Sequence, residues 1–241
     1  HSSVQLIFLS MVMGLPGLIP WIVQHRKQLK TPHMRLYVLR SMLEVMGWFL
    51  AYTAISMMPL PAFSALSFMT PLILSTAAVI ILRERTTIHT WLALVTGGIG
   101  VLIISRPGID MFNDGVIYMI VACSCFSACG IIIKYLAQKK ESPERITFYM
   151  LILTPLFSLP LASMEWSAID LSYGVWYALM ALGTLTQQYC ITKALSLADV
   201  TKVAPFGFMH IVFTSVIAWW LFDEIISLWT LIGGVISTIN I

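Results

Sequence analysis

Charged residues are scarce in this 241-residue chain. Asp, Glu, Lys and Arg together make up 10% of it, whereas about a quarter of the residues of a soluble globular protein are charged. Apolar residues make up 59%. The 14 basic residues lie scattered in short gaps between apolar runs and form no continuous basic stretch, so no nucleic-acid partner is expected. The composition predicts an integral membrane protein embedded in a lipid bilayer.

Cysteine and catalytic motifs are equally sparse. The 4 cysteines all lie within apolar runs, which is typical of buried free thiols and predicts neither a disulfide nor a metal site. The chain contains no H-E-x-x-H, no G-x-S-x-G and no G-x-x-x-x-G-K-[ST]. We therefore expect no catalytic residues, no metal and no cofactor, and no energy source in nucleotide hydrolysis.

Long apolar stretches dominate the sequence. A helix that crosses the hydrocarbon core of a membrane needs about 20 mostly apolar residues. The stretches that meet or approach this length are about 4–23, 36–56, 60–82, 88–105, 114–136, 147–163, 172–192, 200–222 and 228–241. The last is short and the first residue is not Met, so we expect a truncated final helix and a missing first helix.

The sequence repeats itself with a shift of 140 residues. Identical residues then face each other without a gap at eight positions between 54 and 90, for example Phe68 with Phe208 and Glu84 with Glu224. Span 114–136 has no counterpart under this shift, which fits a missing first helix. The complete protein would then consist of two repeats of five helices each. Because five is an odd number of membrane crossings, the second repeat enters the membrane from the opposite side. The expected fold is therefore all-α, with ten membrane helices in two inverted repeats when complete and about nine here.

Basic residues are distributed unequally between the two sides of this arrangement. The loops at 24–35, 83–87, 137–146 and 193–202 share one side and hold eleven Lys and Arg, whereas the opposite loops hold only Arg106. Cytoplasmic loops carry the excess of Lys and Arg. These four loops are therefore predicted to be cytoplasmic, and so are both termini of the complete protein.

Two segments resemble a known family. Residues 59–108 run from a small-residue helix through Ser-x-x-x-Pro and Arg-Glu to a Trp, a Gly-rich helix and a closing Arg-Pro-Gly. They resemble the end of an EamA-type repeat of the drug/metabolite transporter superfamily, and residues 194–236 resemble its second copy. The resemblance implies repeats at 1–108 and 109–241 and a secondary carrier of small organic metabolites in the inner membrane. Asp223 and Glu44 depart from the family's usual pattern.

The segment YVLRSMLEVMGWFLAYTAIS, residues 37–56, is similar to the arginine-bearing third helix of the S-adenosylmethionine uptake group. It places two charges inside an apolar run. Arg40 and Glu44 are four residues apart, so they share one face of a helix and can pair. Trp48 and Tyr52 extend that face. An Arg, Glu, Trp and Tyr stripe can hold a cation or zwitterion through its carboxylate and aromatic rings; snorkelling of Arg40 and a purely structural pair are the alternatives.

Other polar residues lie at membrane depth. Gln188 is the repeat counterpart of Trp48, and Gln187 precedes it, so we expect this amide pair opposite the Glu44 face, in substrate binding or in hydrogen bonds between helices. His210 is a further binding candidate, with a packed histidine as the alternative. Pro71 and Pro205 interrupt two repeat-related helices and are hinge candidates, although their positions do not match under the shift.

These features predict a transporter rather than an enzyme. The expected substrate is a small, amino-acid-like, cationic or zwitterionic metabolite, with S-adenosylmethionine or a nucleobase-like or cofactor-like metabolite as the alternative. A proton or sodium gradient, or exchange, would drive it. An intramembrane enzyme, a channel and a non-transporting membrane protein are the competing classes; the sequence offers no nucleophile and base pair and no selectivity filter for the first two.

Overall fold

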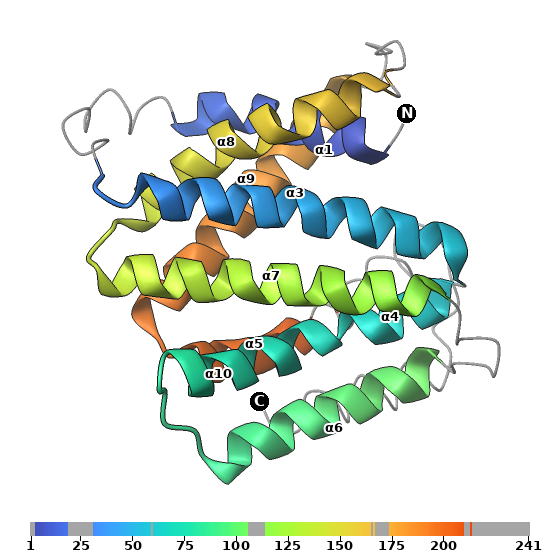
Figure 1. The fold of residues 1–241 in the computed structure, drawn as a ribbon, viewed down its shortest axis with the longest axis vertical. Coiled ribbons are helices and arrows are strands. Elements are labelled where there is room, and N and C mark those ends of the chain that lie inside the picture. Colours follow the sequence, from blue (N-terminus) through green and yellow to red (C-terminus); the bar gives the residue numbers. More distant parts are fainter. Residues whose placement is uncertain are drawn as a thin grey trace. The chain divides into compact units, whose positions relative to one another are not determined.

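The computed structural model describes residues 3–18, 31–58, 60–105, 114–164, 166, 174–209 and 213, and the regular elements among them are all helices. Figure 1 shows their order along the chain. The helices are α1 (Ser3–Gly14), η1 (Leu15–Leu18), α3 (Met34–Met57), α4 (Leu60–Ser67), α5 (Met69–Ile81), α6 (Ile88–Ser105), α7 (Asp114–Gln138), α8 (Pro143–Met164), α9 (Gly174–Leu197), α10 (Val200–Val203) and η5 (Ala204–Phe208). The expected all-α class is therefore confirmed for the described residues.

Several of these helices have the length and apolarity of membrane spans. Among the described residues, Met34–Met57, Asp114–Gln138 and Pro143–Ser163 are long and apolar enough to cross a bilayer. Each coincides closely with a span expected from the sequence. Many large apolar side chains are exposed, such as Ile80 at 71% and Val175 at 71%. Lipid is a solvent in which such exposure carries no hydrophobic penalty.

The expected single helix at 60–82 is wrong, because it is broken at Phe68 into α4 and α5. Pro71 is the third residue of α5, in the first turn, where a backbone N–H has no partner within the helix in any case. A similar change of geometry occurs in the second half of the chain. The four-residue α10 gives way to the 3-10 helix η5, and Pro205 lies at the start of η5.

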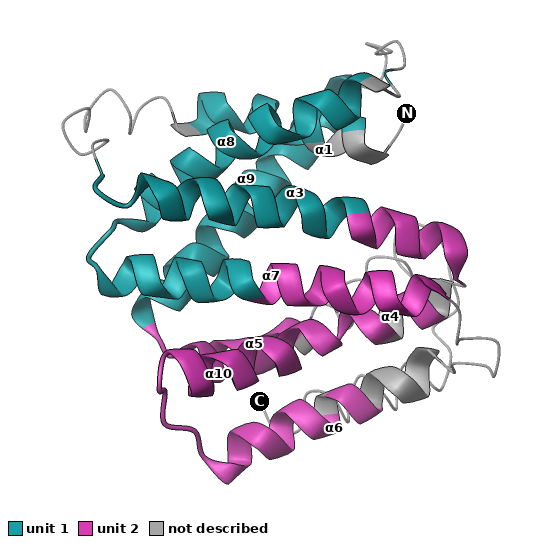
Figure 2. Cartoon of the chain, viewed as in Figure 1, with its two compact units in different colours: residues 1–49, 128–197 teal, residues 50–127, 198–241 magenta. Residues whose placement is uncertain are grey.

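The chain divides into two compact units that interleave its two halves. Unit 1 contains residues 1–49 and 128–197, and unit 2 contains residues 50–127 and 198–241 (Figure 2). In unit 1, α1 packs against both α8 and α9, and α8 contacts α9. Met11 of α1 lies in an apolar cluster with Phe148, Met150 and Leu151 of α8. These contacts make α1, α8 and α9 one packed group.

Unit 2 has an apolar core of small residues. Ala51, Ala54, Ala62 and Ala122 cluster with Met58, Met119 and Cys123. Small side chains allow membrane helices to approach closely, where van der Waals packing replaces the hydrophobic effect. A second cluster joins Leu94 of α6 to Ala204 of η5, and both α5 and α6 contact η5. The repeat boundary near 108 stays a prediction, because the compact units follow contacts and not sequence order.

Candidate functional site

A buried ion pair lies on α3, in unit 1. Arg40 and Glu44 are 2% and 4% exposed, and Arg40 Nη1 lies 3.2 Å from Glu44 Oε2. No proline or glycine before Gly47 interrupts this helix, so the i,i+4 spacing of the two residues puts them on one face. The structure thus places side by side the two charges that the sequence sets within an apolar run.

Two further helices supply hydrogen bonds to the same carboxylate. Thr154 of α8 donates its hydroxyl to Glu44 Oε2 at 2.8 Å, and Gln188 Nε2 of α9 donates to Glu44 Oε1 at 3.2 Å. Thr154 is 0% and Gln188 9% exposed. Glu44 therefore accepts from an arginine, a hydroxyl and an amide on three different helices. We call Arg40, Glu44, Thr154 and Gln188 the Glu44 cluster.

The number of partners matters because an isolated charge is costly in a low-dielectric interior. Desolvating an ion costs several kcal/mol even after relaxation, about enough to unfold a marginal protein if nothing offsets it. Charge pairing and hydrogen bonds to both carboxylate oxygens offset much of that cost. The cluster is not saturated within the part of the chain that the structure describes, where Arg40 Nε is buried and has no hydrogen-bond partner. Among these residues, one guanidinium donor thus has no acceptor.

The other predicted site residues lie outside the Glu44 cluster or outside the described residues. Trp48 and Tyr52 are half-buried and continue along α3, Tyr52 in unit 2. Gln187 is exposed and outside the cluster, because neighbouring positions on a helix point about 100° apart. His210 lies outside the described residues. The hinge candidates Pro71 and Pro205 stand at the helix junctions described above.

A second polar cluster, which we call the Glu141 cluster, was not anticipated. Glu141 follows α7 and is 5% exposed. It accepts hydrogen bonds from Thr31 Oγ1 at 2.6 Å and from Tyr37 OH at 3.1 Å, and it pairs with Arg145 of α8. Sequence reasoning missed it because an acidic residue in a basic loop is usually solvated, and only its i,i+4 spacing to Arg145 gave a signal.

The surroundings of Glu141 change its acidity. Burial on its own would raise the pKa of this carboxyl group. The hydrogen bonds from Thr31, Arg145 and Tyr37, together with the positive charge of Arg145, outweigh burial and hold the pKa of Glu141 below its ordinary value. Glu141 is therefore a carboxylate at neutral pH and ties the segment before α3 to the junction of α7 and α8.

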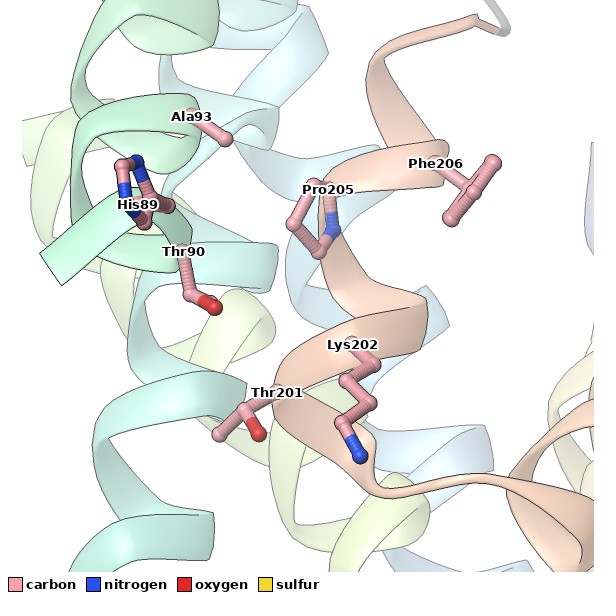
Figure 3. Close-up of a pocket in the computed structure, with 7 residues that line it drawn as sticks. All are labelled: His89, Thr90, Ala93, Thr201, Lys202, Pro205 and Phe206. Atoms are coloured by element: carbon pink, nitrogen blue, oxygen red, sulfur yellow. The ribbon is translucent and has the colours of Figure 1, made fainter. Parts of the chain in front are cut away.

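A pocket of about 270 Å³ lies within unit 2, between α6 and the α10 and η5 segment (Figure 3). The residues that line it include His89, Thr90, Ala93, Thr201, Lys202 and Pro205. The backbone on one side of it is fixed by Glu84. Its carboxylate accepts from the N–H groups of Val200 and Thr201 at 3.0 and 3.1 Å and from Thr201 Oγ1 at 3.2 Å.

Comparison with known proteins places the chain in a transporter family. Residues 1–106 and 113–241 match the model of the EamA-like transporter family. The S-adenosylmethionine uptake transporter of Rickettsia felis is 30% identical over 223 residues, which cover 91% of this chain and 74% of that protein. The riboflavin transporter of Vibrio cholerae is 29% identical over 206 residues, covering 82% of this chain and 66% of that protein.

The fold also has a counterpart among solved structures. A protein crystal structure aligns with a TM-score of 0.81 over 99% of this chain and 88% of the other, at 14% identity. At that identity the likeness concerns the fold alone. The family match and the named relatives point to a multi-pass membrane transporter and not to an enzyme. The chain belongs to the EamA-like transporter family.

Proposed function

We propose that this protein is a secondary transporter that carries a small zwitterionic or cationic metabolite with an amino-acid portion across the cytoplasmic membrane. Transport proceeds by alternating access between two inverted repeats and is driven by a proton or sodium gradient or by exchange. The first candidate substrate is S-adenosylmethionine, which combines an amino-acid zwitterion with a sulfonium cation. The similarity to the S-adenosylmethionine uptake transporter of Rickettsia felis supports this choice.

The observation that carries the proposal is the Glu44 cluster. A carboxylate that is 4% exposed and receives donors from α3, α8 and α9 is costly to maintain for packing alone. Buried ionisable residues in membrane helices commonly mark substrate or ion pathways. Here the carboxylate would attract the ammonium or sulfonium of the substrate, and Arg40 Nε would take its carboxylate.

Exchange of partners gives this site a transport mechanism. A substrate cation that approaches Glu44 would displace neutral donors such as Thr154 and Gln188, each of which belongs to a different helix from Glu44. Losing or regaining these bonds changes the relative stability of helix arrangements, which is what a ligand must do to shift a conformational equilibrium. A proton could replace the substrate cation on Glu44 in the return step.

The test combines transport with two variants. Uptake of labelled S-adenosylmethionine into proteoliposomes is measured for the parent protein, for Glu44→Gln, and for the double variant Arg40→Gln with Glu44→Gln. The double variant removes both charges together, so it leaves no uncompensated ion in the membrane. We expect both variants to lose at least 90% of uptake, roughly 1.4 kcal/mol or more of transport barrier, while Gln187→Ala on the exposed face keeps it.

The outcomes separate a substrate site from a structural pair. If the double variant is folded and transports at the parent rate, Arg40 and Glu44 only hold helices together and the site proposal is wrong. Riboflavin serves as the comparison substrate, because a neutral ring system gains nothing from a carboxylate. Uptake of riboflavin that is indifferent to both variants would favour a cofactor carrier. A protein that neither transports nor is stabilised by any metabolite tested would favour a non-transporting role.

A further inference from the structure

A pair of tyrosine rings precedes the Glu44 cluster along α3 and α8. The rings of Tyr37 on α3 and Tyr149 on α8 pack with their centroids 4.7 Å apart. Further along the same two helices, Glu44 accepts the hydroxyl of Thr154. At 1.5 Å per residue, Tyr37 and Glu44 are separated by roughly 10 Å along the axis of α3. Both helices begin in segments predicted to be cytoplasmic, and this orientation puts the ring pair between Glu44 and the cytoplasm.

The carboxylate of Glu141 holds one of these rings and the start of α3. Tyr37 is 1% exposed and donates its hydroxyl to Glu141 Oε2 at 3.1 Å. Thr31 donates to Glu141 Oε1 at 2.6 Å and accepts the N–H of His33 at 3.0 Å. Figure 1 shows the start of α3 and the junction of α7 with α8 at the same end of these helices. Both oxygens of one carboxylate therefore bind the α3 side.

A tight turn at the end of α7 fixes the position of Glu141. The N–H of Lys140 donates to Ala137 O at 2.9 Å, and the N–H of Glu141 donates to Leu136 O at 3.1 Å, which are the two bonds of a Schellman motif. Lys140 has a φ of 62°, a left-handed conformation that is costly for a residue with a Cβ atom. Arg145, in the first turn of α8, pairs with Glu141. The carboxylate and its counter-ion thus belong to one corner, residues 136–145.

This contact can open without leaving a charge unpaired. If α3 moves away from the corner, Glu141 loses the neutral hydroxyls of Thr31 and Tyr37. Arg145 stays beside Glu141, because both residues belong to the corner. The large penalty for breaking a buried ion pair is therefore avoided. Water that enters as the helices separate can replace the two hydroxyl donors, so the net cost of opening stays small.

We propose that Thr31, Tyr37, Glu141 and Tyr149 form a cytoplasmic clasp, a reversible contact that closes the approach to Glu44 from the cytoplasm. When the clasp opens, the start of α3 leaves the corner and the two rings separate, so that substrate and water reach Glu44 from that side. This inference rests on the proposed carrier function and adds to it the residues that close one entrance to the site.

Two native cysteines of α7 can report the opening. Cys129 Sγ donates to the backbone oxygen of Arg40 on α3 at 3.3 Å, whereas Cys123 Sγ donates to that of Leu66 on α4 at 3.5 Å. The two cysteines are 6% and 0% exposed. The full chain is prepared in two forms, each retaining one of these cysteines and no other, and its reaction with N-ethylmaleimide is timed by mass spectrometry. Separation of α3 from the corner should expose Cys129 and not Cys123.

Two substitutions weaken the clasp in different ways. Tyr37→Phe keeps the ring and removes only the hydroxyl donor, whereas Glu141→Gln removes the charge that accepts it. Reaction of a buried thiol follows the population of the open form. We expect each substitution to raise the rate at Cys129 about tenfold, the effect of losing a hydrogen bond to a charged group. The rate at Cys123 should not change.

The matched controls are Tyr189→Phe and Glu144→Gln. They alter a hydroxyl–carboxylate bond of the same kind, 3.0 Å long, that joins α9 to α8 and does not involve α3. Both should leave the rate at Cys129 unchanged. An unchanged rate at Cys129 in Tyr37→Phe and Glu141→Gln would overturn the clasp. Equal acceleration at Cys129 and Cys123 would also overturn it, because the whole protein would then be loosened.

The same reporter separates the clasp from the substrate proposal. S-adenosylmethionine added to the parent protein should change the rate at Cys129, because a transported substrate shifts the balance between open and closed forms. A rate that responds to Tyr37→Phe and Glu141→Gln but not to S-adenosylmethionine would support the clasp and count against that substrate.

Discussion

Glu44 unites three helices through one side chain. Its two oxygens accept from Arg40 Nη1, Thr154 Oγ1 and Gln188 Nε2, with distances between 2.8 and 3.2 Å. Each donor contributes differently: the arginine balances charge, whereas the hydroxyl and the amide satisfy lone pairs that water would otherwise fill. The loss of stability caused by a single substitution therefore depends on which group remains buried without its partner.

Removing the charge of Glu44 alone should reduce the free energy of unfolding more than removing the charges of Arg40 and Glu44 together. Glu44→Gln leaves Arg40 buried without a counter-ion, and we expect a loss of about 3–5 kcal/mol in the free energy of unfolding. Arg40→Gln together with Glu44→Gln should recover most of this loss. Thermal unfolding of the single and double variants in detergent measures the coupling; additive losses would show that the two side chains do not interact.

Thr154→Val should lower the free energy of unfolding by about 1–3 kcal/mol, because it leaves a carboxylate lone pair of Glu44 buried and unsatisfied. Thr154→Ser keeps the donor and should be close to the parent in stability apart from its lost methyl group. Thr76→Val is the control, since the exposed Thr76 hydroxyl donates back to Leu72 O of its own helix at 2.8 Å. Equal melting temperatures for Thr154→Val and Thr76→Val would contradict the assignment of this hydrogen bond.

At the residue scale, three of the four members of the Glu44 cluster could be derived from the sequence. The i,i+4 spacing paired Arg40 with Glu44, and the repeat shift directed attention to Gln188. Thr154 could not be singled out, because threonines in apolar helices usually bond to their own backbone, as Thr76 and Thr96 do here. Which helix of the bundle faces α3 depends on tertiary packing, and no local pattern in α8 encodes it.

Helix ends are joined by carboxylates that come from distant parts of the chain. Glu84, after α5, binds the first residues of α10, and Glu141, after α7, binds Thr31 and Tyr37 near the start of α3. Glu84 accepts from the free N–H groups at the start of α10, which attract anions, whereas Glu141 accepts from two side-chain hydroxyls. These contacts fix the start of α3, which contains the buried charges, and the start of α10, which leads directly into η5 and Pro205.

Glu84→Gln should loosen the start of α10. The substituted amide keeps one acceptor oxygen but turns N–H donors toward the N–H groups of Val200 or Thr201, so we expect a loss of about 0.5–2 kcal/mol, as for other helix caps. Hydrogen exchange at these two amides should accelerate. Glu144→Gln is the control, because an amide oxygen still accepts the Tyr189 hydroxyl bond of 3.0 Å. Unchanged exchange in Glu84→Gln would show that the cap does not stabilise α10.

The Glu141 cluster should make stability dependent on acid pH. Because the pKa of Glu141 is lowered in the folded protein, the stabilisation is complete above the pKa of the unfolded chain and is lost as pH falls through the lower folded value. The difference in melting temperature between the parent and Glu141→Gln should therefore shrink steadily below about pH 4.5, the ordinary range of a Glu carboxyl. A difference in melting temperature that stays constant from pH 7 to pH 3.5 would show that the carboxylate of Glu141 does not stabilise the folded protein.

The sequence predicted the boundaries of some helices closely and missed others. Spans 36–56, 88–105 and 114–136 agree closely with α3, α6 and α7, and none of the three contains a proline. The break at Phe68 was missed, since the hydropathy of α4 and α5 is continuous and a proline in the first turn of a helix gives only an approximate position. The 3-10 geometry of η5 depends on packing against α5 and α6, which hydropathy does not report.

At the scale of the whole molecule, the described residues combine many exposed apolar side chains with a few buried charges. Composition alone identified the membrane class, and the two family matches, at 1–106 and 113–241, agree with the transporter class that the quoted motifs implied. The inverted arrangement of repeats and the orientation in the membrane remain predictions. They rest on the register of the repeat and on the distribution of basic residues.

Orientation can be measured with single cysteines in a background that lacks the 4 native ones. Lys139→Cys, in a loop predicted to be cytoplasmic, should be labelled by a membrane-impermeant maleimide only in inverted membrane vesicles. Trp166→Cys, 45% exposed in the native side chain and in a loop predicted to be external, should be labelled in intact cells. Labelling of both positions from one side would contradict the predicted topology.

The ion pair of Arg40 and Glu44 also has an electrical consequence. Moving one elementary charge through a potential of 100 mV involves about 2.3 kcal/mol. Opposite charges held 3.2 Å apart sum to zero, so the empty carrier would shift no net charge at this site when its helices rearrange. The return of a carrier with neither substrate nor proton bound should then be insensitive to membrane voltage, whereas a cationic cargo, or a proton on Glu44, would bring a voltage dependence with it.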